Sequence, residues 1–205
     1  MLERFRQFWT RLLSPIANFL LRIGVSPDAV TLVGTLGVSA GALYFFPRGE
    51  LLVGVLVITA FVFSDLIDGY MARAAGTSSR WGAFLDSSLD RIADAAIFGG
   101  LVLYFAHDQD DMLMASVALY CLVMGSLTSY VRARAESLGM QAKVGIAERA
   151  DRLVSVLVLA GFSEIFNQPA LLDIVLWALA AASTVTVVQR MVVVRRQALA
   201  DDVPA

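Results

Sequence analysis

The stretch Met112–Val131 reads MLMASVALYCLVMGSLTSYV and contains no charged side chain. A helix needs roughly 20 mostly apolar residues to cross the hydrocarbon core of a bilayer, which is about 30 Å thick. This stretch therefore predicts a membrane-spanning helix. Other uncharged runs occupy 29–47, 51–64, 95–106, 153–163 and 174–189. Their repetition along the chain predicts a protein with several spans.

The composition agrees with this prediction. Of the 205 residues, 58% are hydrophobic and 17% are charged, and the formal net charge is −2. An ordinary soluble domain is about 45–50% apolar and about 25% charged, so this chain has too few polar residues to cover a soluble core. The single cysteine, Cys121, and the single histidine, His107, exclude an intrachain disulfide and a Cys/His zinc site.

We predict an all-α integral membrane protein in which six transmembrane helices follow an N-terminal juxtamembrane amphipathic helix. A membrane β-barrel is not expected, because its strands alternate in polarity and these runs do not. In the segment 1–23, apolar residues recur at helical spacing with arginines mostly off that face, which is typical of an interfacial helix. A signal peptide, the competing interpretation, normally has a clean apolar centre and a cleavage site. The predicted spans are about 29–47, 51–73, 82–106, 112–136, 150–167 and 170–192.

The basic residues predict how the chain is oriented. With six spans, 15 of the 16 lysines and arginines fall on the side that holds both termini, and Arg48 alone falls on the other side. By the positive-inside rule, the basic side is cytoplasmic. We therefore expect a multi-pass protein of the cell membrane whose termini are both cytoplasmic. Its parts would be an interfacial helix at 1–23, a six-helix domain at 24–194 and a tail at 195–205.

Four aspartates interrupt the second and third predicted spans. Asp65 and Asp68 are three residues apart, and Asp86 and Asp90 are four apart, so each pair lies on one helix face. An aspartate at a helix centre costs roughly 2.5–3.5 kcal/mol on insertion scales, so the four acids need cations or protons. Oxygen ligands without histidine or thiolate favour Mg²⁺ or Mn²⁺, and two carboxylate pairs suggest two ions.

Other interpretations of these residues stay open. Asp94 next to the cluster is expected to be an ion-pair partner, for example of Arg91. Gly69 and Gly82 would let a ligand approach the backbone, or would serve helix packing. The acids could also belong to a divalent-cation channel or carrier. A stripe of small residues could pack helices within the chain or across a dimer, namely Gly34, Gly37, Ser39, Ala40 and Gly41. Nucleic-acid binding has no support, because the basic residues form no solvated patch.

The residues from Asp65 to Asp90 spell D-x2-D-G-x2-A-R-x8-G-x3-D-x3-D, with every fixed position filled. This pattern resembles the motif of the CDP-alcohol phosphatidyltransferases. The resemblance implies a six-spanning enzyme, commonly a homodimer, that displaces CMP from a CDP-linked lipid or alcohol. The stretches 26–31, 129–136 and 148–152 resemble the bacterial phosphatidylinositol phosphate synthases of that family, and the likeness extends over nearly the whole chain up to about Arg190.

The resemblance also implies roles for individual residues. Asp65, Asp68, Asp86 and Asp90 would bind two metal ions, and Asp90 would also act as the general base. CDP-diacylglycerol would be held by Asp28, Ala29, Val30, Thr31, Gly69, Arg73 and Ser79. The phosphate of the acceptor alcohol would be held by Arg132, Arg152 and Arg190.

The acceptor is predicted from the arginines at the cytoplasmic helix ends, which are Arg132, Arg134, Arg149, Arg152 and Arg190. Several guanidinium groups near the acids would form an anion site, which suits an acceptor that carries its own phosphate. Each arginine could instead reach lipid headgroups. We expect transfer of the phosphatidyl group to inositol 1-phosphate at an active site facing the cytoplasm, rather than to free inositol, serine or choline. The rival within the family is glycerol 3-phosphate, the acceptor of a phosphatidylglycerophosphate synthase.

Overall fold

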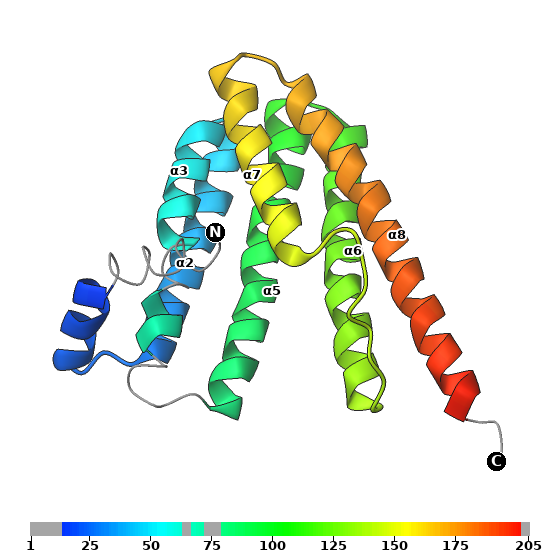
Figure 1. Ribbon diagram of the computed structural model, residues 1–205. Coiled ribbons are helices and arrows are strands. Elements are labelled where there is room, and N and C mark those ends of the chain that lie inside the picture. Colours follow the sequence, from blue (N-terminus) through cyan, green and yellow to red (C-terminus); the bar gives the residue numbers. More distant parts are fainter. Residues whose placement is uncertain (1–13, 63–66, 72–78, 202–205) are drawn as a thin grey trace, which may run out of the picture. The chain divides into compact units, whose positions relative to one another are not determined.

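The computed structural model describes residues 14–62, 67–71 and 79–201, and all regular structure in these ranges is helical. The prediction of an all-α chain is therefore confirmed for the described residues (Figure 1). Helices also cover 14–22, inside the predicted amphipathic segment, and 67–71. The long helices are α2 (Pro27–Phe45), α3 (Leu51–Val62), α5 (Arg80–Leu103), α6 (Met112–Ser137), α7 (Arg149–Ile165) and α8 (Ala170–Asp201), with short helical turns η1 (Phe46–Arg48) and η2 (Tyr104–Asp108).

Each of the six predicted spans overlaps one of the long helices. Among the described residues, four stretches are long and apolar enough to cross a membrane: Pro27–Arg48, Leu51–Met71, Met112–Ser137 and Ala170–Ala200. The other two helices differ from these: α5 carries Asp86, Asp90, Arg91 and Asp94 along its length, and α7 is short. Helix α7 has 17 residues and so extends only about 25 Å. Helix α8 continues to Asp201, into the segment predicted as a tail.

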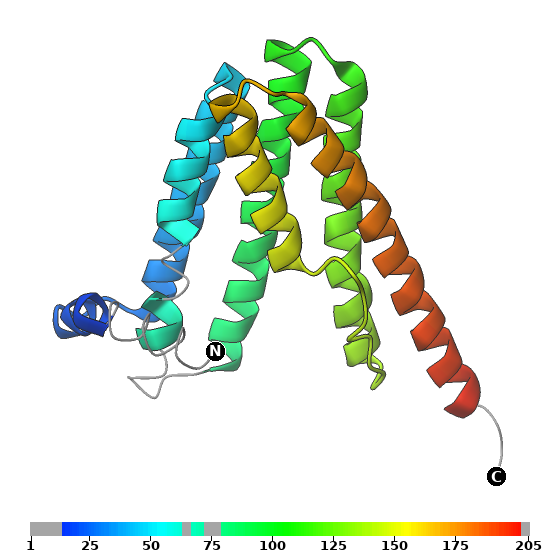
Figure 2. The same ribbon diagram turned by 45° about the horizontal axis from the view of Figure 1, so that its top comes forward.

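The chain divides into two compact units, one of Met1–Phe45 with Val53–Ile97 and one of Phe46–Leu52 with Phe98–Ala205. In the first unit, α2 and α3 pack as an antiparallel pair (Figure 2). A Cβ atom built on Gly37 would overlap the ring of Phe61, and one on Gly41 would lie 3.0 Å from Val57 Cγ1. These two glycines therefore allow close helix contact within the chain, which is one of the two roles expected for the small-residue stripe.

Serine side chains define where two helices of this unit begin. The Ser26 hydroxyl accepts a hydrogen bond from the Ala29 N–H (3.2 Å), and Pro27 occupies the first turn of α2. The Ser79 hydroxyl likewise accepts from the Gly82 N–H (2.9 Å) at the start of α5. Serine before the first turn satisfies an N–H that has no partner inside the helix, and proline fits the first turn because it has no N–H to lose.

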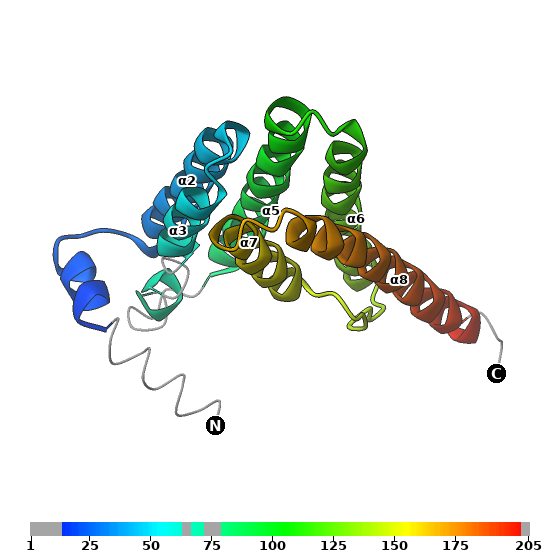
Figure 3. The same ribbon diagram turned by 90° about the horizontal axis from the view of Figure 1, so that it is seen from above.

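In the second unit, α8 packs against both α6 and α7 (Figure 3). Leu176 on α8, Val156 on α7 and Cys121 on α6 are fully buried in this packing. At the C-terminal end of α7, the Glu164 carboxylate accepts a hydrogen bond from the Leu52 N–H (2.6 Å). This bond provides a partner for an N–H in the first turn of α3, where a negative charge is favourable.

The connection between α6 and α7, residues 138–148, is bound to α8 by side chains. The side-chain amide of Gln197 on α8 bonds both backbone groups of Gln141. Its Oε1 accepts from the Gln141 N–H (2.9 Å), and its Nε2 donates to the Gln141 carbonyl (2.6 Å). The Thr186 hydroxyl accepts from the N–H groups of Ile146 and Ala147 (3.2 Å each). The connection is thus fixed at two places along one helix.

The contact between Gly37 and Phe61 generates a test of the α2–α3 packing. We expect Gly37→Ala to lower the free energy of unfolding in detergent by about 1–3 kcal/mol, because the added methyl group forces the Phe61 ring out of place. The control is Gly99→Ala on α5, where an added Cβ meets no atom within 4 Å. The control should be neutral or stabilising, since alanine favours a helix interior over glycine. Equal thermal stability of the two variants would contradict the described packing.

Candidate functional site

Asp68 is the described member of the first predicted carboxylate pair, and it is buried, with 7% of its surface exposed. The Thr31 hydroxyl on α2 donates a hydrogen bond of 2.6 Å to Asp68 Oδ2. A bond this short is typical of a hydroxyl that donates to a charged carboxylate. Thr31, which the resemblance assigns to the CDP-lipid, therefore also holds one oxygen of Asp68 in place. Asp65 lies outside the described residues.

Asp86 and Asp90 lie one turn apart on α5, and both carboxylates repel the negative charge of Asp68. The side chain of Asp90 is 23% exposed, and Asp86 is exposed. Neither Asp68 nor Asp86 forms an ion pair with an arginine or lysine of the described ranges. The described acids therefore bring negative charge toward Asp68 from α5.

The described acids can be compared with the ligands expected for the predicted metal ions. Within the described residues, no group of three or more acidic, histidine or cysteine side chains is arranged to hold a metal ion. Asp68, Asp86 and Asp90 offer only carboxylate oxygens, which suit a hard divalent cation such as Mg²⁺ or Mn²⁺. The described acids therefore fit such an ion chemically, while one predicted ligand, Asp65, is not described.

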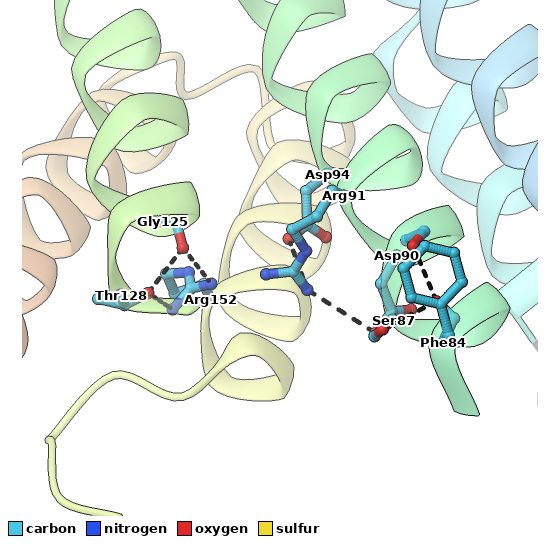
Figure 4. A network of polar contacts seen from close by, with 9 residues as sticks. Phe84, Ser87, Asp90, Arg91, Asp94, Gly125, Thr128 and Arg152 are labelled. Carbon is cyan, nitrogen blue, oxygen red and sulfur yellow. Dashed lines mark hydrogen bonds and ion pairs between the residues drawn. The ribbon is translucent and has the colours of Figure 1, made fainter. Parts of the chain in front are cut away.

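Arg91 lies beside two acids of its own helix (Figure 4). Its Nη2 is 3.6 Å from Asp94 Oδ2 and 3.7 Å from Asp90 Oδ2. The expectation that Asp94 pairs with Arg91 is confirmed. Arg91 thus places a positive charge beside Asp90 and Asp94.

The residues expected to hold the CDP-lipid lie at the starts of α2 and α5. Asp28 and Thr31 are in the first turns of α2, together with Ala29 and Val30, while Ser79 precedes α5. A Cβ atom built on Gly82 would lie 3.4 Å from Ser79 Oγ and 3.8 Å from Asp28 Oδ1. Gly82 thus faces two predicted ligand contacts, and the distances leave room for a methyl group. Gly69 follows Asp68 in the helical stretch 67–71, and Arg73 lies outside the described residues.

Two of the three predicted phosphate-binding arginines are buried in the second unit. Arg152 of α7 is 3% exposed and donates from Nη1 to Thr128 Oγ1 (3.2 Å) and to the Ala147 carbonyl (2.9 Å). Its Nη2 donates to the Gly125 carbonyl (3.4 Å), and Figure 4 shows the guanidinium directed at α6. A Cβ atom on Gly125 would lie 3.3 Å from Arg152 Nε, so glycine leaves space for this side chain.

Arg190 of α8 is 5% exposed and reaches the same part of α6. Its Nη1 donates to the Thr128 carbonyl (2.6 Å) and its Nε donates to the Val144 carbonyl (2.8 Å). The structure thus brings Arg152 and Arg190 together around Thr128. Burial of both residues argues against the alternative in which they extend to lipid headgroups.

Arg132, the third predicted arginine, is placed differently. Its side chain is 41% exposed, and its Nε donates to Glu136 Oε1 one turn along α6 (3.0 Å). Its positive charge acts on that of Arg190, so the two guanidinium groups lie near each other. A surface ion pair of this kind is worth little in water, so Arg132 can exchange Glu136 for another anion at small cost.

The sequence analysis did not identify Thr128, the residue that joins the two buried arginines. It lies within the uncharged run Met112–Val131 and looks like an ordinary small residue of a transmembrane helix. Only its position four residues before Arg132, on the same helix face, could have drawn attention to it.

Comparison with known proteins agrees with the motif. The family model of CDP-alcohol phosphatidyltransferase matches residues 24–188. A phosphatidylinositol phosphate synthase of Streptomyces avermitilis is 54% identical, over 98% of this chain and 86% of the relative. A protein of the same name from Cutibacterium acnes is 51% identical, over 96% of this chain and 98% of the relative.

Solved structures of the Mycobacterium tuberculosis phosphatidylinositol phosphate synthase are also similar. The one with CDP-DAG bound is 44% identical, covers 90% of this chain and 94% of its own, and has a TM-score of 0.87. The one in complex with manganese and citrate is 43% identical, covers 89% of this chain and 88% of its own, and has a TM-score of 0.83. The matched family is one of enzymes, which does not support the alternative of a cation carrier. This chain belongs to the CDP-alcohol phosphatidyltransferase family and is a membrane enzyme of phospholipid synthesis.

Proposed function

We propose that this enzyme transfers the phosphatidyl group of CDP-diacylglycerol to inositol 1-phosphate and forms phosphatidylinositol phosphate and CMP. The observation that carries this proposal is the pair of buried guanidinium groups, Arg152 and Arg190, around Thr128 on α6. Buried positive charge suits an acceptor that brings a phosphate of its own, whereas free inositol, serine and choline bring none. The names of the relatives from Streptomyces avermitilis and Cutibacterium acnes support the same acceptor.

The acids have a separate role in the proposal. Asp65, Asp68, Asp86 and Asp90 would hold two divalent ions, Mg²⁺ or Mn²⁺, which supply positive charge to the diphosphate of the lipid substrate. The manganese complex of the Mycobacterium tuberculosis protein supports a divalent cation. The cytidine diphosphate part would be held by Asp28, Ala29, Val30, Thr31, Gly69, Arg73 and Ser79, and the CDP-DAG complex of the same relative supports that substrate.

Asp90 is the proposed general base. It would take the proton from the acceptor hydroxyl while that oxygen attacks the phosphorus attached to diacylglycerol. The bond between this phosphorus and the bridging oxygen breaks, and CMP leaves with the bond's electron pair. Arg91 lies 3.7 Å from Asp90 Oδ2 and would place positive charge beside the proposed base.

The proposal also includes the membrane arrangement. Residues 24–194 would form a six-helix catalytic domain in the cell membrane, with the amphipathic helix 1–23 at the interface and a tail at 195–205. Both termini and the active site would face the cytoplasm, as the positive-inside rule predicts. The enzyme would act as a homodimer.

The first test is the choice of acceptor. We expect the purified protein in detergent, with CDP-diacylglycerol and Mg²⁺ or Mn²⁺, to transfer label from radiolabelled inositol 1-phosphate to the lipid fraction and to release one CMP per transfer. Free inositol should give no labelled lipid, because it offers no phosphate to the arginines. Turnover with glycerol 3-phosphate but none with inositol 1-phosphate would overturn the proposed acceptor.

The second test separates phosphate binding by Arg132 from a general effect of positive charge. We expect Arg132→Gln to raise the KM for inositol 1-phosphate by about tenfold, because a charge-assisted hydrogen bond to the phosphate is lost. The KM for CDP-diacylglycerol should not change. Arg134→Gln removes the same charge from an exposed arginine two residues away and should leave both constants unchanged. Equal effects of the two substitutions would contradict the assignment of Arg132.

The third test concerns the base. We expect Asp90→Asn to lower kcat by at least about 10²-fold, because an amide cannot take the proton of the acceptor hydroxyl. The variant should remain folded in detergent, as judged by its thermal unfolding. Asp94→Asn on the next turn of α5 is the matched control, and it should retain transfer because Asp94 is not one of the four motif aspartates. Normal turnover in Asp90→Asn would remove the base assignment.

A further inference from the structure

We propose that Thr128 is a positioning residue, which sets the geometry of both buried arginines through its hydroxyl and its carbonyl group. This inference rests on the proposed function, which assigns Arg152 and Arg190 to the phosphate of the acceptor. Thr128 is 1% exposed and lies on α6, whereas the arginines come from α7 and α8. One residue therefore links guanidinium groups from two other helices.

The hydrogen bonds at Thr128 have a defined direction. Its hydroxyl has a single proton, which it donates to the Gly125 carbonyl one turn earlier (2.6 Å). The lone pairs of the same oxygen are then available to accept from Arg152 Nη1 (3.2 Å). Because a branched side chain such as threonine has few allowed χ1 rotamers in a helix, the bond to Gly125 fixes the oxygen that Arg152 contacts.

The Thr128 carbonyl holds Arg190 by a different route. A backbone carbonyl has two lone pairs, so it can accept from Arg190 Nη1 (2.6 Å) as well as from an N–H of its own helix. Substitution of the side chain leaves this backbone contact in place. The hydroxyl contact to Arg152 can therefore be removed separately from the contact to Arg190.

The loop between α6 and α7 holds each guanidinium from another side. Arg152 donates to the Ala147 carbonyl (2.9 Å), and Arg190 donates from Nε to the Val144 carbonyl (2.8 Å). Guanidinium has five N–H donors. The described contacts of Arg190 use Nε and Nη1, which leaves the donors of Nη2 for a ligand. The described hydrogen bonds of both arginines therefore include carbonyl oxygens of this loop, which orient the guanidinium groups.

The test is a KM measurement on three variants of the full chain. We expect Thr128→Val to raise the KM for inositol 1-phosphate by about tenfold, because Arg152 loses an acceptor that fixes its orientation. The KM for CDP-diacylglycerol should stay within about twofold of the wild-type value, since the lipid is assigned to other residues. Thr128→Ser keeps the hydroxyl and should restore the wild-type KM for inositol 1-phosphate.

The matched control is Thr184→Val on α8. The Thr184 hydroxyl donates to the Ala180 carbonyl of its own helix (2.7 Å) and contacts the Tyr120 hydroxyl (2.8 Å), so the same substitution removes a helix bond that involves neither arginine. The control should leave the KM for inositol 1-phosphate unchanged. If Thr128→Val does not fold, Thr128→Ala removes the same hydroxyl without adding a methyl group in its place.

An unchanged KM for inositol 1-phosphate in the folded Thr128→Val or Thr128→Ala variant would overturn the inference. Equal increases in both KM values would also overturn it, because they would indicate a general structural role. These outcomes differ from a failure of the proposed function, which would appear in the wild-type enzyme as no turnover of inositol 1-phosphate. In that case, the acceptor that the wild type does use would serve as the probe for Thr128.

Discussion

Charged side chains on apolar helices need polar partners from elsewhere in the chain, and this constraint accounts for the main polar contacts of the structure. A carboxylate or guanidinium group removed from water loses its hydration, and the loss is large unless hydrogen bonds or opposite charges replace it. Asp68 accepts a hydrogen bond from the Thr31 hydroxyl. Arg152 and Arg190 donate hydrogen bonds to carbonyl oxygens of α6 and of the connection 138–148. The contacts of the two arginines link α7 and α8 to α6 and to the connection 138–148.

The two units satisfy this constraint in opposite ways. In the first unit, Asp86 and Asp90 act on the negative charge of Asp68, and a cation would relieve this repulsion. In the second unit, two buried arginines donate hydrogen bonds to Thr128, so positive charge is gathered at one place on α6. A reaction between a diphosphate lipid and a phosphate-bearing alcohol needs both kinds of site. The net charge of −2 sums charges of both signs over the whole chain, and so it indicates neither site.

The sequence predicted those features that depend on local pattern. Uncharged runs located the helices because a span is defined by its own residues, and the fixed spacing from Asp65 to Asp90 identified the family. The spacing also predicted that the acids of two helices approach, and Asp86 and Asp90 of α5 do act electrostatically on Asp68. The pairing of Asp94 with Arg91 followed from helix geometry alone. The count of six spans is less direct, because α5 carries several charged residues and α7 has only 17 residues, so neither is among the four apolar stretches.

The partners of the buried arginines could not be predicted. Thr128, Val144 and Ala147 contribute backbone or hydroxyl oxygens, and every residue has a carbonyl group, so the sequence has no pattern that marks these three. The binding of the connection 138–148 to Gln197 and Thr186 joins residues about 40 to 56 positions apart, as the fold requires. Such contacts depend on how α6, α7 and α8 pack, and that packing is not encoded in any one stretch.

The central claim is that the arginines hold the acceptor phosphate while the aspartates hold the divalent ions. The most direct measurement is a structure of this protein with CDP-diacylglycerol, Mn²⁺ and inositol 1-phosphate bound. The account predicts that the inositol phosphate group lies about 3 Å from guanidinium nitrogens of Arg132, Arg152 and Arg190, with Mn²⁺ on the motif aspartates. A phosphate bound elsewhere, with Arg152 and Arg190 contacting only the chain's own oxygens, would contradict it.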